Sequence, residues 1–135
     1  MGKSDDMMRL VIIIGVVLSV WFADWAAAQQ IVDVHCHNIM SGYMEVLKKH
    51  DAALEETFPL PEWNVDAHLA FMEKAGIGCS VLSMPAPQPY FGDTGECRRI
   101  IREYNEYCAA LKKKYPGKFK FCAALPLPDV NAAID

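Results

Sequence analysis

Two histidines stand two residues apart in the segment Asp33-Val34-His35-Cys36-His37. The run that contains them, beginning at Ile31, is short and rich in β-branched residues, which is typical of a strand. Side chains alternate along a strand, so Asp33, His35 and His37 are predicted to share one face. Two neutral imidazoles on one face can bind the same divalent ion. We therefore predict that His35 and His37 are metal ligands at the carboxyl end of a strand, where α/β enzymes place their sites.

The predicted metal site is incomplete within this sequence. Catalytic zinc usually has three protein ligands and one open position. The other histidines, His50 and His68, fall at a predicted helix end and within a predicted helix, so both are interpreted as structural or solvated. Asp33 lies deeper in the strand, where it either orients a histidine or forms hydrogen bonds beneath the site. A purely structural role for the histidine pair stays open as the alternative.

Helix-like and strand-like segments alternate after the histidine pair. We expect a short helix from Ser41, its predicted cap, to His50, and then a loop over residues 51–62 that contains two prolines. A second helix is expected to start at the cap Asn64 and to end at Gly76. A strand over residues 77–84 and a loop over residues 86–92 follow.

The clearest helix signal follows Asp93, which has capping-box spacing to Glu96. Apolar residues recur at helical spacing and form one stripe. These residues are Cys97, Ile100, Ile101, Tyr104, Cys108 and Leu111. A lysine run and Pro116-Gly117 end this helix, and a third strand is expected over residues 119–127. Residues 130–135 have the pattern of the first turn of another helix.

The resulting order is β-α-β-α-β-α, which predicts an α/β fold. The second and third strands lack a clean polar alternation, as expected of parallel strands covered on both faces. Consecutive units of this kind build either an open doubly wound sheet or a (β/α)8 barrel. The chain of 135 residues is long enough for one domain.

The N-terminus has the order of a secretory signal peptide: a charged start, an apolar run over residues 10–22 and the small residues Ala26 to Ala28. We predict a signal over residues 1–28 and a mature domain over 29–135, hence an exported protein. A retained membrane anchor over residues 10–22, or a buried helix, is the alternative, although a spanning helix needs about 20 apolar residues.

Charge and cysteine content narrow the function classes. The formal net charge is −4, so no basic excess points to nucleic acid. The five cysteines form no C-x-x-C pair, which indicates neither a disulfide framework nor a cysteine zinc site. Most are predicted to be small buried apolar residues, with one disulfide left open.

Several segments resemble one family, the amidohydrolase superfamily. Residues 31–37 resemble the first barrel strand, residues 63–77 (WNVDAHLAFMEKAGI) the first long helix, residues 81–85 the end of strand two and residues 119–128 (FKFCAALPLP) strand three with its turn. Together they are similar to the N-terminal portion of the amidohydrolase-related branch that includes aminocarboxymuconate-semialdehyde decarboxylase. The family's proline shortly after H-x-H is absent, since Asn38 to Gly42 fill that stretch.

The resemblance implies a (β/α)8 TIM barrel with one divalent metal, most often zinc, and places His35 and His37 as the strand-one ligands. The family's other ligands and its catalytic histidine come from later strands, beyond residue 135. A typical barrel needs about 250 residues. We therefore expect this chain, with three of the βα units, to be an inactive N-terminal part of the enzyme.

The resemblance further implies decarboxylation of a small acid, or hydrolysis of an ester, lactone or amide, by a metal-dependent enzyme, with a homodimer as one arrangement of the full-length form. Aromatic residues in or near loops on the active face are candidates for the substrate pocket, although packing is the commoner role. These are Tyr43, Trp63, Tyr90 and Phe91. The alternatives are another H-x-H barrel, such as a TatD-like nuclease or a phosphoesterase, and a non-catalytic exported fragment or binding module.

Overall fold

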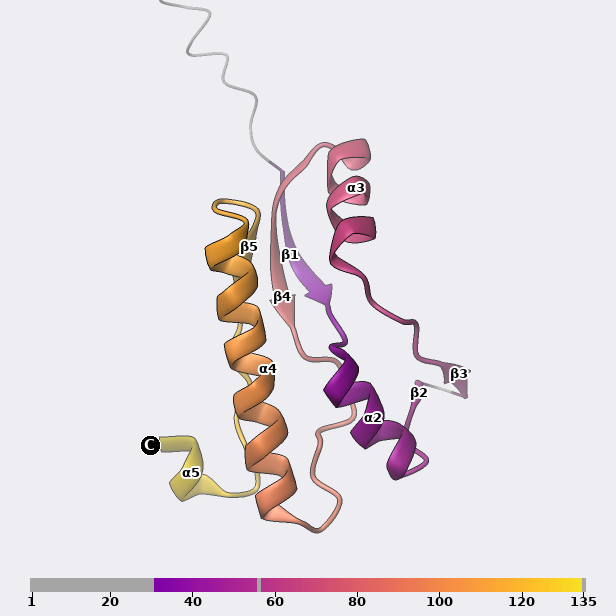
Figure 1. Cartoon of the computed structure of the whole chain (residues 1–135), viewed down its shortest axis with the longest axis vertical. Coiled ribbons are helices and arrows are strands. Elements are labelled where there is room, and N and C mark those ends of the chain that lie inside the picture. The colour runs from indigo at the N-terminus through magenta and orange to yellow at the C-terminus, as the bar shows by residue number, and fades with distance from the viewer. Residues whose placement is uncertain (1–30, 56, 135) are drawn as a thin grey trace, which may run out of the picture.

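The computed structural model describes residues 31–55 and 57–134. Three parallel strands form its main sheet, and the helices follow them in sequence (Figure 1). The elements are β1 (Ile31–His37), α2 (Ser41–Lys49), β2 (Leu54–Glu55), β3 (Phe58–Pro59), α3 (Val65–Ala75), β4 (Ile77–Ser83), α4 (Thr94–Lys114), β5 (Phe119–Phe121) and α5 (Val130–Ile134). The predicted signal over residues 1–28 and the alternative anchor over 10–22 lie outside the described residues. Within the described part, no helix combines the length and apolar character needed to cross a bilayer.

The main sheet has the order β1-β4-β5, with both pairs parallel. Each parallel pair is joined by a crossover that contains a helix, as parallel pairing requires. The predicted α/β class and the alternation of strands and helices are therefore confirmed. Register matches His37 with Ser83, so the carboxyl ends of β1 and β4 lie side by side.

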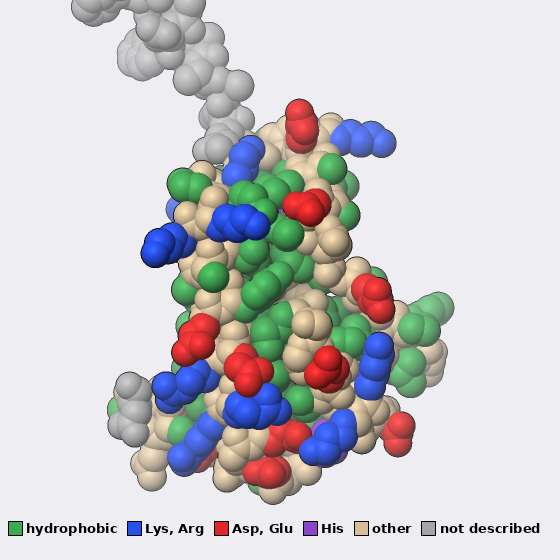
Figure 2. Space-filling view, viewed as in Figure 1, with side chains coloured by type: hydrophobic (Ala, Val, Ile, Leu, Met, Phe, Trp, Pro, Cys, Tyr) green, Lys and Arg blue, Asp and Glu red, His purple; other side chains and the backbone are tan. Residues whose placement is uncertain are grey.

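Helices α3 and α4 contact the sheet through β4 and β5 respectively. The whole apolar stripe predicted on α4, from Cys97 to Leu111, is buried. It packs with Leu82 and Phe119 of the sheet and with Tyr43 and Leu47 of α2 in a single core cluster. Figure 2 shows hydrophobic side chains along the middle of the helix-bearing face, with charged side chains around them. This burial supplies most of the driving force for packing helices on strands.

β1 is exposed along much of its length, unlike the parallel strands expected to be covered on both faces. Ile31 is 56% exposed and Val34 is 75% exposed. The pairing with β4 also shifts register between Asp33 and Cys36, so the strict alternation expected for this strand is interrupted there. Nothing among the described residues covers this apolar part of β1, which leaves it open to further chain or to a partner.

Two helix caps form as predicted. The Asn64 side chain accepts hydrogen bonds from the backbone N–H groups of Asp66 and Ala67, and Gly76 ends α3 with φ 69°. A positive φ is easy for glycine because it has no Cβ. Asp93 accepts from the N–H groups of Gly95 and Glu96, although the Glu96 carboxylate binds α2 residues and does not close a capping box.

Three local predictions were wrong. Ser41 is the first residue of α2, after Met40, and gives no cap hydrogen bond. The predicted loop over residues 51–62 contains the short antiparallel pair β2 and β3, in which Pro59 is tolerated because the ribbon has only edges. The third strand ends at Phe121 and not at Leu127, because the Asn105 side chain takes both backbone hydrogen-bonding groups of Ala124.

All five cysteines are free thiols, and four of them are buried. Cys122 is the exposed one. The prediction that most cysteines are small core residues is therefore confirmed.

Candidate metal site

The histidine pair lies at the carboxyl end of the parallel sheet, at the edge where open α/β sheets and barrels hold ligands. β1 ends at His37, and the chain then turns directly into α2 at Ser41. Both imidazole rings are exposed. The site is thus carried by a strand end that is fixed on one side by β4 and open on the other.

The Nε2 atoms of His35 and His37 are 3.1 Å apart, and the two rings meet edge to face at 84°. Zinc–nitrogen bonds of about 2.0–2.1 Å at a tetrahedral angle would place two such nitrogens roughly 3.3 Å apart. The two side chains therefore already point at one location with nearly the spacing that a shared ion requires. This is the arrangement predicted from the two-residue spacing.

Ser83, at the end of β4, contacts the second histidine from the other side of its ring. Its Oγ lies 3.0 Å from His37 Nδ1 and 3.4 Å from the carbonyl oxygen of Cys36. A polar partner on the second ring nitrogen is the usual way in which a metal-binding histidine is oriented. Ser83 was not predicted as a site residue, because its closeness to His37 depends on the strand register.

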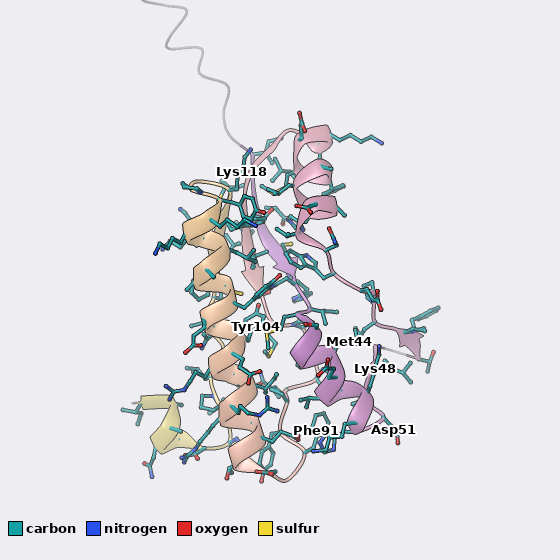
Figure 3. The ribbon with its side chains drawn as sticks, in the orientation of Figure 1. Met44, Lys48, Asp51, Phe91, Tyr104 and Lys118 are labelled. Atoms are coloured by element: carbon teal, nitrogen blue, oxygen red, sulfur yellow. The ribbon has the colours of Figure 1, made fainter. Side chains whose placement is uncertain are left out.

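Asn38, the residue after the histidine pair, anchors the strand end in the core and is fully buried. Its Oδ1 accepts a hydrogen bond of 2.6 Å from the Tyr104 hydroxyl, and its Nδ2 donates to Cys108 Sγ at 3.6 Å. Its backbone N–H donates to the carbonyl oxygen of Ser83. In Figure 3, Tyr104 points from α4 toward the start of α2, where this anchor lies. Asn38 was also missed, since nothing in its type marks it as buried.

Asp33 forms its hydrogen bond with the backbone and not with a histidine ring in this structure. Its Oδ1 accepts a hydrogen bond from the backbone N–H of His35 at 3.1 Å. No hydrogen bond to an imidazole is found for Asp33 among the described residues. Of the two roles predicted for Asp33, local hydrogen bonding beneath the site is the one seen.

Cys36 and His68 lie on the helix side of β1. His68 Nε2 is 3.2 Å from Ser80 Oγ and 3.8 Å from Cys36 Sγ. Burial lowers the pKa of His68, while Asp33 acts in the opposite direction. Burial, with a smaller contribution from Asp33, raises the pKa of Cys36 to about 11, so its thiol stays protonated and is no ready metal ligand.

His50 has a structural role at the junction of α2 and α4. Its Nε2 lies 2.7 Å from Glu96 Oε2, and its ring stacks on Phe91 with centroids 4.3 Å apart. Both remaining histidines are thus held by protein contacts, His50 by Glu96 and His68 by Ser80, which agrees with the structural role predicted for them.

The four aromatic pocket candidates do not meet in one cavity of the described chain. Tyr43 is buried, and its hydroxyl donates to the carbonyl oxygen of Pro87 at 2.5 Å, which ties α2 to the loop after β4. Phe91 packs on His50 and Tyr90 is exposed. Trp63 lines a cavity of about 260 Å³ beside α2.

That cavity is lined by Ile39, Ser41, Met44, Glu45, Lys48, Glu62 and Trp63. Met44 and Lys48 lie one turn apart on α2 in Figure 3. Because Ile39 follows His37 by two residues, the cavity adjoins the loop that leaves the histidine pair.

The donor set fits a divalent ion but does not complete its coordination. The imidazole nitrogens of His35 and His37 converge, and nitrogen ligands suit zinc and similar ions. Across residues 31–55 and 57–134, no group of three or more His, Cys, Asp or Glu side chains is placed to hold a metal. Any further ligands must come from outside this described set.

Comparison with known proteins gives consistent similarities, although no family model matches the chain. A decarboxylase of Aspergillus niger, yanB, is 32% identical over 109 residues, which are 77% of this chain and 29% of that protein. The chain thus spans about a third or less of that relative's length.

Solved structures agree with this similarity. One described as an amidohydrolase II is 32% identical, with a TM-score of 0.74 over 78% of this chain and 34% of the other. A 2,6-dihydroxybenzoate decarboxylase from Rhizobium is 27% identical, with a TM-score of 0.61 over 78% of this chain and 32% of the other. A dihydroxybenzoic acid decarboxylase from Polaromonas, with bound manganese, shares the fold at 21% identity, with a TM-score of 0.61 over 77% and 32% of the two chains.

Proposed function

The chain matches amidohydrolase-superfamily enzymes over part of their length, and from this premise we propose that it supplies the first two metal ligands of a decarboxylase. The substrate class is a small unsaturated or aromatic carboxylic acid. His35 and His37 hold one divalent ion, which is zinc by ligand type or manganese by analogy with the Polaromonas enzyme. The single observation that carries the proposal is the 3.1 Å approach of the two Nε2 atoms at a strand end.

The ion, when bound, would act as a Lewis acid that polarises a substrate oxygen. The protein's own contribution is to fix two ligands before the ion arrives. β1 sets their common face, Asp33 accepts the N–H of His35, and Asn38 buries the strand end in the core. Preorganised ligands lower the cost of binding because little freedom remains to be lost.

Decarboxylation is preferred to hydrolysis because two of the similar proteins, the yanB protein and the Rhizobium enzyme, are decarboxylases. Hydrolysis of an ester, lactone or amide is the second candidate. It is favoured by the 32% identity to the structure described as an amidohydrolase II. The two reactions share the same histidine pair and differ in the bond that breaks.

We extend the proposal to the substrate entrance, the N-terminal segment and the oligomeric state. The small cavity beside Trp63 is proposed as part of the substrate entrance, and the N-terminal segment as a signal for export or as an anchor. A homodimer is proposed for the full-length form. Because no group of three or more His, Cys, Asp or Glu side chains is placed to hold a metal among the described residues, the proposed site needs ligands beyond them.

The first test is made on the protein isolated from its source cells, whatever its mass there. Metal content and release of CO2 from 2,6-dihydroxybenzoate and related acids are measured for the wild type and for His35→Ala, His37→Ala and the control His50→Ala. The proposal expects both histidine-pair variants to lose metal and activity, the latter at least 100-fold, while His50→Ala keeps both. Full activity in His35→Ala or His37→Ala would exclude the proposed site, and cleavage of esters or amides without CO2 release would favour the second candidate.

A further inference from the structure

We infer that Ser83 is a positioning residue whose hydroxyl keeps the His37 proton on Nδ1 and so presents Nε2 as the metal-binding atom. The inference rests on the proposed metal site, and it assigns a role to a residue on a different strand from the ligands. It concerns which nitrogen carries the proton before any ion is present. It can therefore be tested apart from the enzyme activity.

The direction of the hydrogen bonds follows from the two partners of Ser83 Oγ. The Cys36 carbonyl oxygen, at 3.4 Å, can only accept, so both contacts of Oγ are hydrogen bonds only if the Ser83 hydroxyl donates its single proton to that oxygen. His37 Nδ1, at 3.0 Å, must then be the donor to Oγ. A neutral imidazole carries one N–H, so His37 Nε2 is left with a free lone pair.

The partner histidine takes the opposite tautomer. The two Nε2 atoms are 3.1 Å apart, a hydrogen-bonding distance that needs one proton between them. Since His37 Nε2 has none, the proton belongs to His35 Nε2. An ion bound by both Nε2 atoms would displace this proton to His35 Nδ1, while His37 would keep its proton on Nδ1 throughout.

The backbone holds Ser83 where this role requires it. His37 and Ser83 are register partners in the parallel pair β1 and β4. The backbone N–H of Asn38 donates to the Ser83 carbonyl oxygen at 3.2 Å, and Asn38 is itself locked to Tyr104. The serine and the histidine thus have little freedom to separate.

The chain also offers a matched control. Ser80 lies three residues before Ser83 on β4 and contacts a different histidine, with its Oγ 3.2 Å from His68 Nε2. A serine-to-alanine change at either position removes the same atom from the same strand. Only the change at Ser83 should alter the histidine pair.

The experiment records long-range ¹H–¹⁵N spectra of the imidazoles in the full 135-residue chain, at a pH well above the ordinary histidine pKa of about 6.5. The wild type should show His37 as the Nδ1–H tautomer and His35 as the Nε2–H tautomer. Ser83→Ala should leave His37 in a mixture of tautomers, Ser83→Thr should restore the wild-type spectrum, and Ser80→Ala should change only His68. Circular dichroism confirms that each variant is folded.

Titration with Zn²⁺ and with Mn²⁺ alone gives the second readout. Ser83→Ala should weaken binding about 10- to 100-fold, as loss of such outer contacts typically does, with rescue by Ser83→Thr. An Nε2–H tautomer of His37 in the wild type, or an unchanged His37 spectrum in folded Ser83→Ala, would overturn the inference. A different result would refute the proposed metal function and not this inference. In that case the wild-type chain shows the expected tautomers, but neither it nor the protein isolated from source cells binds either ion.

Discussion

Asn38 shows how a single buried amide can determine where a ligand strand ends. Its Oδ1 has one described partner, the Tyr104 hydroxyl at 2.6 Å, and both residues are fully buried. Burial raises the pKa of Tyr104 above its usual value, so the hydroxyl remains a donor at any ordinary pH. The strand end that carries His37 therefore depends on a contact made by α4.

Tyr104→Phe should accordingly destabilise the fold, because it leaves a buried amide oxygen without its donor. We expect a loss of about 1–3 kcal/mol in the free energy of unfolding, measured by urea denaturation. Tyr107→Phe is the control, since the Tyr107 hydroxyl makes no hydrogen bond among the described residues and its removal should cost less than about 0.5 kcal/mol. Equal losses for the two variants would show that the contact with Asn38 is not what stabilises this strand end.

At the same scale, the sequence indicated the two candidate ligands, His35 and His37, but not the residues that hold them in place. His35 and His37 were predictable because strand periodicity alone puts them on one face. Ser83 and Asn38 were not, since their roles arise from the register of β1 against β4 and from the packing of α4. The sequence offered one signal for these two residues, namely that each is a polar residue at the end of a predicted strand.

Between elements, Glu96 joins the first turn of α4 to the last turn of α2. Its carboxylate lies 2.6 Å from Lys49 Nζ and 2.7 Å from His50 Nε2. The hydrogen bond from Lys49, and to a smaller extent the one with His50, holds the pKa of Glu96 below its usual value. A carboxyl with a lowered pKa in the folded state binds fewer protons when folded than when unfolded, which makes stability depend on pH.

This junction should therefore stabilise the fold above the unfolded-state pKa of about 4.3 and lose its effect as the pH falls through the lower folded-state pKa. Glu96→Gln should lower the melting temperature at neutral pH, and the difference from wild type should vanish in acid. Glu106→Gln, an exposed change on the same helix, should show no such convergence. Parallel melting curves for wild type and Glu96→Gln at every pH would contradict this assignment.

The cap of α3 offers an independent test of local structure. Asn64 Oδ1 accepts from two backbone N–H groups at 2.9 and 3.0 Å. Asn64→Ala should reduce the free energy of unfolding by about 1 kcal/mol, whereas Asn64→Asp should preserve the cap and most of the stability. Calorimetry of the three proteins would decide, and a loss as large in Asn64→Asp as in Asn64→Ala would argue against capping by this side chain.

Elements were predictable where the signal was local and not where distant contacts override it. The caps Asn64 and Asp93, and the stripe of α4, depend on residues within a few turns of each other. The length of β5 depends on Asn105, nineteen residues before Ala124 in sequence, which competes for the backbone that a longer strand would use. The ribbon of β2 and β3 had no alternating apolar pattern to reveal it.

For the whole molecule, the sheet presents an apolar strand and an open edge together. Val34 and Ile31 of β1 are exposed, and β1 stands at the end of the order β1-β4-β5 with pairing only to β4 among the described residues. An unpaired, apolar strand edge is a template for pairing with further chain. In the proposed enzyme, the rest of a barrel would cover this edge.

The isolated 135-residue chain should consequently self-associate as its concentration rises, because a second copy can cover β1 when nothing else does. Sedimentation velocity should show this growth, and Val34→Lys should reduce it by placing a charge on the edge strand. Phe71→Lys is the matched control, since Phe71 is 58% exposed but lies on α3, away from the strand edge. If Phe71→Lys suppresses association as strongly as Val34→Lys, general surface hydrophobicity and not the open edge of β1 drives it; if neither does, the edge is already protected in solution.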